Sequence, residues 1–75
     1  MTTEELVERI NKLIAEHGGS IPESSSSWDN ECAHLDEDEI YNDVFKAIRD
    51  GAMNAKELAA ECVRLSELPF NRWYA

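Results

Sequence analysis

Apolar side chains recur with the period of an α-helix in three separate stretches of the chain. Their members are Leu6, Val7, Ile10, Leu13 and Ile14 in the first, Ile40, Tyr41, Val44, Phe45 and Ile48 in the second, and Ala55, Leu58, Ala59, Cys62, Val63 and Leu65 in the third. This spacing predicts amphipathic helices over about residues 3–17, 37–50 and 55–67. No stretch has the alternating pattern of a strand, so we expect an all-α domain of three principal helices.

Each predicted helix begins with a capping side chain that lies three residues before a glutamate. The pairs are Thr2 with Glu5, Asp36 with Glu39, and Asn54 with Glu57. The first pair matches a capping box, and the other two are close relatives of it. Leu35 and Ile40 also have the spacing of a hydrophobic staple around the second start. The sequence therefore predicts N-caps at Thr2, Asp36 and Asn54.

Residues 18–35, between the first two helices, are predicted to form a long acidic loop. Gly18 and Gly19 supply the stop for the first helix, and Ser24–Ser27 is typical of a flexible linker. Trp28 could instead pin the loop to the helices through its large apolar side chain. Loops of this length within a compact domain are usually either functional or disordered, and the sequence leaves both interpretations open.

Acidic side chains are concentrated in this loop and at the predicted start of the second helix. The chain of 75 residues has 16 acidic and 7 basic side chains, which give a formal net charge of −9 at pH 7. Residues 18–39 contain no Lys or Arg and seven acids: Glu23, Asp29, Glu31, Asp36, Glu37, Asp38 and Glu39. These acids either solvate the loop and complement the helix dipole, or form a surface that meets a basic partner and disfavours nucleic acid.

The second interpretation defines a set of candidate partner-binding residues. Trp28 is the expected apolar anchor, and the expected charged contacts to a basic protein are Asp29, Glu31, Asp36, Glu37 and Asp38. Trp73 is a further candidate in the aromatic tail of residues 68–75. The tail aromatics, which include Phe70, either pack onto the helices or form an interface such as a homodimer seam.

The sequence contains no recognisable pattern of catalytic or metal-ligating residues. Cys32 and His34 are too close together for a usual zinc pair, and no C-x-x-C accompanies them. The run from Asp36 to Glu39 lacks the glycine and the alternating ligands of a calcium-binding loop. We therefore expect no cofactor, no metal and no enzymatic activity.

The apolar segments are too short for a membrane protein. No apolar run approaches the roughly 20 residues of a membrane span, and the acidic N-terminal residues lack the apolar region of a signal peptide. We expect a single small cytoplasmic domain with no membrane partner. The thiols of Cys32 and Cys62 are then expected to stay reduced, although their spacing also allows one disulfide.

The C-terminal half of the chain resembles a helix-turn-helix. The segments that carry the resemblance are Ala47–Gly51, Asn54–Cys62 and Ser66–Trp73. The resemblance implies a first motif helix over Ala55–Glu61 and a recognition helix that Ser66 caps. The turn lacks the usual glycine, and the second motif helix has Arg72 as its single base. Because DNA affinity depends on Lys and Arg, the resemblance concerns the fold more than DNA binding.

In size, acidity and lack of a catalytic motif, the whole chain resembles the small inhibitor proteins that phages and mobile elements encode against host machinery, including anti-CRISPR proteins. Such proteins often occupy a nucleic-acid-binding groove, which implies a basic, nucleic-acid-handling partner. The resemblance rests on no motif, so no functional residue carries over from it. The sequence thus predicts an acidic protein–protein interaction module, an inhibitor or adaptor, with a degenerate helix-turn-helix regulator as the alternative.

Overall fold

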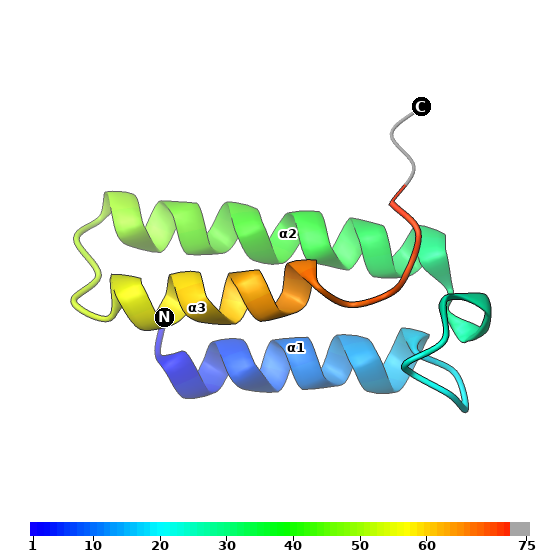
Figure 1. Cartoon of the computed structure of the whole chain (residues 1–75). Coiled ribbons are helices and arrows are strands. Elements are labelled where there is room, and N and C mark those ends of the chain that lie inside the picture. The colour runs from blue at the N-terminus through cyan, green and yellow to red at the C-terminus, as the bar shows by residue number, and fades with distance from the viewer. Residues whose placement is uncertain (73–75) are drawn as a thin grey trace.

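Three helices form the fold, with the second helix antiparallel to both the first and the third, in a computed structural model that describes residues 1–72 (Figure 1). Helix α1 spans Thr3–His17, α2 spans Asn30–Arg49 and α3 spans Ala55–Ser66, and a short 3-10 turn, η1, occupies Ser25–Ser27. Each helix contacts the other two. The prediction of an all-α fold with three principal helices is confirmed. None of the helices in residues 1–72 is both long and apolar enough to span a membrane.

One stripe of side chains from each helix forms the hydrophobic core. The buried members are Leu6, Ile10 and Leu13 of α1, Ala33, Ile40 and Val44 of α2, and Leu58 and Leu65 of α3, with Trp28 and Phe70 at one end. Burial of a large apolar side chain stabilises a fold by about 1.5–3 kcal/mol. Each helix therefore contributes its apolar face to the core and leaves the opposite face exposed.

The N-cap of α1 follows the sequence prediction. The Thr2 hydroxyl accepts a hydrogen bond from the Glu5 backbone N–H at 3.0 Å, and the Glu5 carboxylate accepts one from the Thr2 N–H at 3.3 Å. This reciprocal arrangement is a capping box. Asn54 is the N-cap residue of α3, as predicted, but its side chain makes no capping hydrogen bond, because its amide donates to Met1 O at 3.2 Å and to Thr3 Oγ1 at 3.0 Å instead. Asn54 thereby ties the start of α3 to the start of α1.

The predicted start of the second helix is wrong, because α2 begins at Asn30 and Asp36 lies within it. Asp29 is the N-cap, and its carboxylate accepts from the Cys32 backbone N–H at 3.4 Å. The Asp29 N–H in turn donates to His17 O, the last residue of α1, at 2.8 Å. The long acidic loop over residues 18–35 is therefore not confirmed, because residues 30–35 belong to α2 and the shorter connection before them contains the turn η1.

Residues 18–29 join α1 to α2, and hydrogen bonds within this segment hold its conformation. The Ser27 hydroxyl donates to Gly18 O at 3.0 Å and to Ser24 O at 2.9 Å. Gly19 has a φ of 65°, a left-handed conformation that favours glycine. The Trp28 indole N–H donates to Pro22 O, and its ring is buried. Of the two interpretations of this segment, the structure shows the one in which Trp28 pins it to the helices.

The chain after α3 folds back onto the same end of the bundle. The Phe70 ring is buried against that of Trp28, with 5.1 Å between the ring centroids. The guanidinium of Arg72 lies 3.9 Å from the centre of the Phe70 ring. Phe70 therefore packs onto the helices rather than forming an exposed interface, whereas Trp73 and Tyr74 lie outside the described residues.

Candidate protein-binding surface

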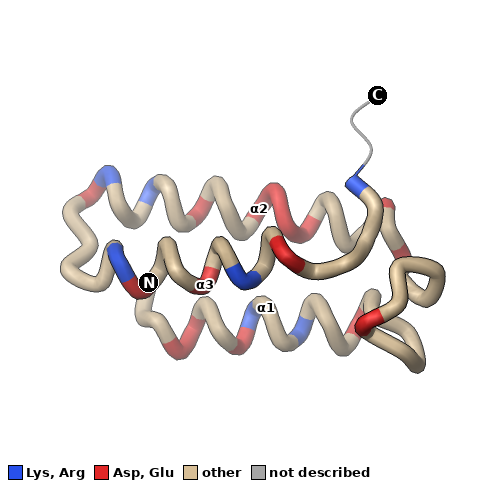
Figure 2. The backbone as a smooth tube through the Cα atoms, in the orientation of Figure 1, with Lys and Arg blue, Asp and Glu red and all other residues tan. Residues whose placement is uncertain are grey.

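Three exposed side chains follow one another along the outer face of α2. Glu31, Leu35 and Glu39 are spaced four residues apart, so they share a face of the helix. This face is opposite the buried stripe, and the side chain of Leu35 is 59% exposed. We call these three residues the acidic stripe. Figure 2 shows that the acidic positions of α2 gather in its first half, while its Lys and Arg lie toward its C-terminal end.

Five of the seven Lys and Arg side chains pair with acids elsewhere, whereas Lys46 and Lys56 form no ion pair within residues 1–72. The pairs are Arg9 with Asp43, Lys12 with Glu16, Arg49 with Asp50, Arg64 with Glu61, and Arg72 with Glu37. Within residues 1–72, no Lys or Arg forms an ion pair with Glu31 or Glu39. The acidic stripe therefore carries negative charge that the described part of the fold leaves unneutralised.

Two of the acids predicted to bind a partner lie at the sides of this stripe. Asp38 is about half exposed, and its carboxylate lies 3.4 Å from Nε2 of His34 one turn earlier. Asp36 faces α1, where it pairs with His17. Of the predicted set, Glu31 and Asp38 are thus the best placed to meet a partner. Asp29 is exposed as well, but its carboxylate is engaged as the helix cap.

Glu37 and Trp28 are corrections to the predicted set, because both side chains are buried. Glu37 is only 1% exposed and accepts hydrogen bonds from Arg72 Nε at 2.9 Å and from the Tyr41 hydroxyl at 2.7 Å. Trp28 is 6% exposed and belongs to the core. Neither side chain can reach a partner while the protein is folded. Trp73, the remaining predicted residue, lies outside the described residues.

The hydrogen bond between Tyr41 and Glu37 has an electrostatic consequence. Burial, together with the adjacent Glu37 carboxylate, raises the pKa of Tyr41 well above its ordinary value of 10.0. The Tyr41 hydroxyl therefore remains a donor to Glu37 throughout the neutral and mildly alkaline range. With Arg72, it supplies the partners that a buried carboxylate needs.

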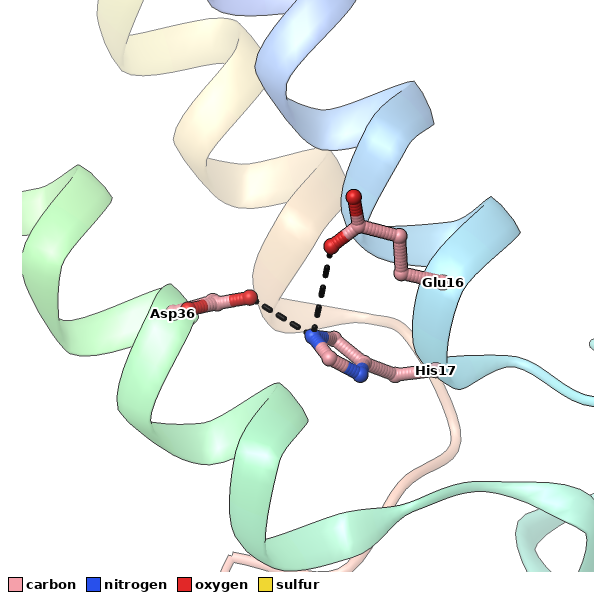
Figure 3. A group of neighbouring side chains, drawn as sticks. All are labelled: Glu16, His17 and Asp36. Atoms are coloured by element: carbon pink, nitrogen blue, oxygen red, sulfur yellow. Dashed lines mark hydrogen bonds and ion pairs between the residues drawn. The ribbon is translucent and has the colours of Figure 1, made fainter.

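A hydrogen bond from a histidine to a carboxylate joins the last residue of α1 to the second turn of α2 (Figure 3). Nε2–H of His17 donates to the Asp36 carboxylate at 2.6 Å, and Glu16 Oε2 lies 4.0 Å from the same nitrogen. Ligand atoms from these residues lie within 4.8 Å of one another, the range of a metal site. Two ligands of one tetrahedral zinc lie about 3.3 Å apart, given bonds of about 2.0–2.1 Å. At 2.6 Å the His17–Asp36 contact has the geometry of a hydrogen bond between helices instead.

The two cysteines are free thiols, and neither has the environment of an activated nucleophile. Hydrogen bonding to Asp29 and the charge of its carboxylate raise the pKa of Cys32 above its ordinary value. Burial, with a smaller contribution from Glu61, raises the pKa of Cys62. Since the thiolate is the reactive form, both residues are poorly suited to nucleophilic chemistry at neutral pH.

Leu35 is the residue of this surface that the sequence analysis did not identify. It was expected to be the apolar member of a staple before the second helix, yet it lies in the second turn of α2 with most of its side chain in solvent. The signal that could have revealed it is the spacing of Ala33, Ile40 and Val44. These three residues form one helical stripe, and Leu35 lies on the opposite side of it.

The segment that resembles a helix-turn-helix adopts a different local structure from the one implied. Ser66, expected to cap a recognition helix, is the last residue of α3, and residues 67–72 form no helix. Comparison with protein-family models, curated proteins and solved structures finds no match to this chain. The function is therefore inferred from the surface itself.

Proposed function

We propose that this protein is a small protein-interaction module, an inhibitor or adaptor, whose acidic stripe binds a basic surface on a nucleic-acid-handling partner. The observation that supports this most is the exposure of Leu35 between Glu31 and Glu39 on the outer face of α2. Leu35 places an apolar side chain between two carboxylates that form no ion pair with Lys or Arg within residues 1–72.

The carboxylates of the acidic stripe and the apolar side chain of Leu35 would contribute differently to binding. The carboxylates of Glu31 and Glu39, with Asp38 beside them, would attract a basic surface and raise the association rate, an effect that salt screens. Leu35 would supply apolar contact, since removing a leucine side chain from water stabilises a complex by about 1.5–3 kcal/mol. Charge would thus select the partner, and Leu35 would add affinity once the surfaces meet.

The proposed class of partner follows from the charge that it must carry. Proteins that bind nucleic acid neutralise phosphates with clusters of Lys and Arg, and such a cluster is complementary to the acidic stripe. A partner with this surface would be blocked from nucleic acid while the stripe occupies it. This mode of action agrees with the resemblance of the chain to small phage-encoded inhibitors.

Competition for the partner provides the test. The partner would be captured from native cells with the wild type and purified. It would then be loaded with a fluorescent oligonucleotide, and the displacement of this oligonucleotide by each variant would be measured. We expect the wild type to displace the oligonucleotide and Glu31→Lys/Glu39→Lys to fail. The matched control, Glu8→Lys/Glu57→Lys, changes the net charge equally at exposed sites outside the stripe and should displace it as the wild type does.

The outcomes separate the proposal from its alternative. If the stripe variant and the control displace the oligonucleotide equally well, the acidic stripe is only solvated surface. The alternative, a helix-turn-helix regulator, instead requires the isolated chain to bind DNA by itself.

A further inference from the structure

A second exposed surface, distinct from the acidic stripe, lies along the junction of α2 and α3. Three large apolar side chains remain in solvent there: Phe45 is 67% exposed, Val63 is 57% exposed and Ile48 is 39% exposed. A shallow groove between the two helices is lined by Tyr41, Phe45, Cys62, Val63 and Ser66. An apolar area of this kind on a small protein marks an interaction surface.

The charges that flank this apolar area follow a regular order on α3. Lys56, Ala60 and Val63 of α3 and its C-cap residue Glu67 are exposed and separated by four, three and four residues, so they lie along one side of the helix. The stripe has a base at its N-terminal end, small and apolar side chains in its middle, and an acid at its C-terminal end.

The exposed side chains of α2 repeat this order in reverse. Asp38, Asn42, Phe45 and Arg49 have the same separations of four, three and four residues and are all exposed. Here the acid is at the N-terminal end and the base at the C-terminal end, where Arg49 also pairs with the exposed Asp50 at 3.0 Å. Because α2 and α3 are antiparallel neighbours (Figure 1), Asp38 and Glu67 lie toward one end of the surface, and Arg49 and Lys56 lie toward the other.

We infer that this α2–α3 surface binds a second copy of the same chain, related by a twofold axis perpendicular to the helices. Such an axis places the acidic end of each copy on the basic end of the other. Lys56 then faces Glu67 of the second copy, and Arg49 faces Asp38. An isologous interface must be complementary to itself, and a surface with opposite charges at its two ends and an apolar middle meets that requirement.

The composition of the surface and the size of the protein also favour a second copy of the chain as the partner of this surface. Ala59 and Ala60 on α3 are small and exposed, so they let a second helix approach closely while Phe45 and Val63 become buried. Domains of this size often supplement a thin core by association. The tail aromatic Phe70 is buried within the monomer, so the homodimer seam expected there is replaced by the α2–α3 surface.

The dimer does not depend on the proposed function. Glu31, Leu35 and Glu39 are not among the dimer contacts, so the dimer would present two acidic stripes, with Asp38 beside each stripe engaged by Arg49 of the second copy. If the protein binds the partner but does not dimerise, only the dimer is refuted. If it dimerises but binds no basic partner, only the proposed function is refuted.

The apolar part of the proposal is tested by sedimentation equilibrium from micromolar to millimolar protein. We expect a concentration-dependent dimer for the wild type, weakened about a hundredfold or more by Phe45→Ser/Val63→Ser, because each copy loses two buried side chains. The control is Leu35→Ser/Ile21→Ser, which removes two side chains of similar exposure, 59% and 58%, from other surfaces. This control should dimerise like the wild type. A wild type that stays monomeric, or equal dimerisation of both double variants, would overturn the proposal.

The twofold arrangement is tested by charge exchange. Lys56→Glu alone and Glu67→Lys alone should each weaken the homodimer about tenfold, since each creates two repulsive contacts in place of two attractive ones. An equimolar mixture of the two variants should recover a wild-type affinity as a heterodimer, because both contacts then join opposite charges. Circular dichroism verifies that each variant is folded. Failure of the mixture to form the heterodimer would contradict the antiparallel twofold.

Discussion

Arg72 forms an ion pair with Glu37 at 2.9 Å, although Glu37 is 1% exposed and lies on the buried face of α2. The same guanidinium donates to the backbone carbonyls of Leu65 at 3.1 Å, Leu68 at 2.9 Å and Phe70 at 3.0 Å. These carbonyls belong to the last turn of α3 and the segment after it. A single arginine therefore neutralises a buried carboxylate and closes the end of α3 over the core.

Replacing Arg72 should destabilise the protein severely. Arg72→Ala leaves the Glu37 carboxylate buried with only Tyr41 as partner, and loss of one member of a buried ion pair costs about 3–5 kcal/mol. Chemical denaturation of the variant measures the change in the free energy of unfolding. Lys12→Ala, which removes an exposed pair with Glu16 at 3.7 Å, should change it by less than about 1 kcal/mol. Equal effects of the two substitutions would show that the Glu37–Arg72 pair is not structural.

The start of α2 is tested by its cap. Asp29→Ala should lower the free energy of unfolding by about 0.5–2 kcal/mol, since the Cys32 N–H loses its side-chain acceptor. Glu23→Ala, in the exposed connection before η1, is the control and should have little effect. Thermal melts of the two variants provide the comparison. A Glu23→Ala variant as unstable as Asp29→Ala would contradict the assignment of the cap.

The apolar pattern of the sequence does not predict this start of α2. The first two turns of α2 carry Ala33 and Glu37 on the buried face, where an apolar stripe would normally show large hydrophobic residues. Because an alanine and an acid occupy these positions, the apolar helical pattern of α2 can be recognised only from Ile40 onward. A buried carboxylate becomes plausible only when its partner Arg72 is known, and that residue is 35 positions away in sequence.

Features that depend on local spacing are predicted well. The three helices follow from apolar periodicity, and the Thr2 capping box follows from residues three positions apart. Contacts between distant segments are not encoded in any local pattern. The packing of Trp28 on Phe70 buries the predicted anchor, and the true start of α2 turns Leu35 from a staple residue into an exposed one. The acidic character of the candidate surface could thus be predicted, but its apolar centre could not.

The raised pKa of Tyr41 predicts a specific loss of stability in alkaline solution. A tyrosine in the unfolded chain loses its proton near pH 10.0, whereas burial and Glu37 hold Tyr41 protonated in the folded state. The unfolded state therefore becomes favoured as the pH rises above that value. The free energy of unfolding, measured on either side of pH 10.0, should fall for the wild type. The fall should be shallower for Tyr41→Phe, and identical slopes would contradict the contact with Glu37.

The isolated protein should not bind nucleic acid. Its formal net charge of −9 opposes phosphates, and the single Arg72 of the segment after Ser66 is engaged with Glu37. We expect no mobility shift with DNA or RNA at physiological salt. A sequence-specific complex with a Kd of about 10⁻⁸ to 10⁻¹¹ M would refute the inhibitor proposal and favour the helix-turn-helix regulator.

Association kinetics provide the sharpest test of whether the acidic stripe of α2 binds a basic partner. The captured partner would be immobilised and its association rate with the wild type, Glu31→Lys/Glu39→Lys and Glu8→Lys/Glu57→Lys measured at low and physiological ionic strength. We expect a fast wild-type rate that falls steeply with salt, a similar profile for the control, and a slow rate with a flat salt dependence for the stripe variant. If the stripe variant associates as fast as the control at low salt, the acidic stripe does not bind the partner.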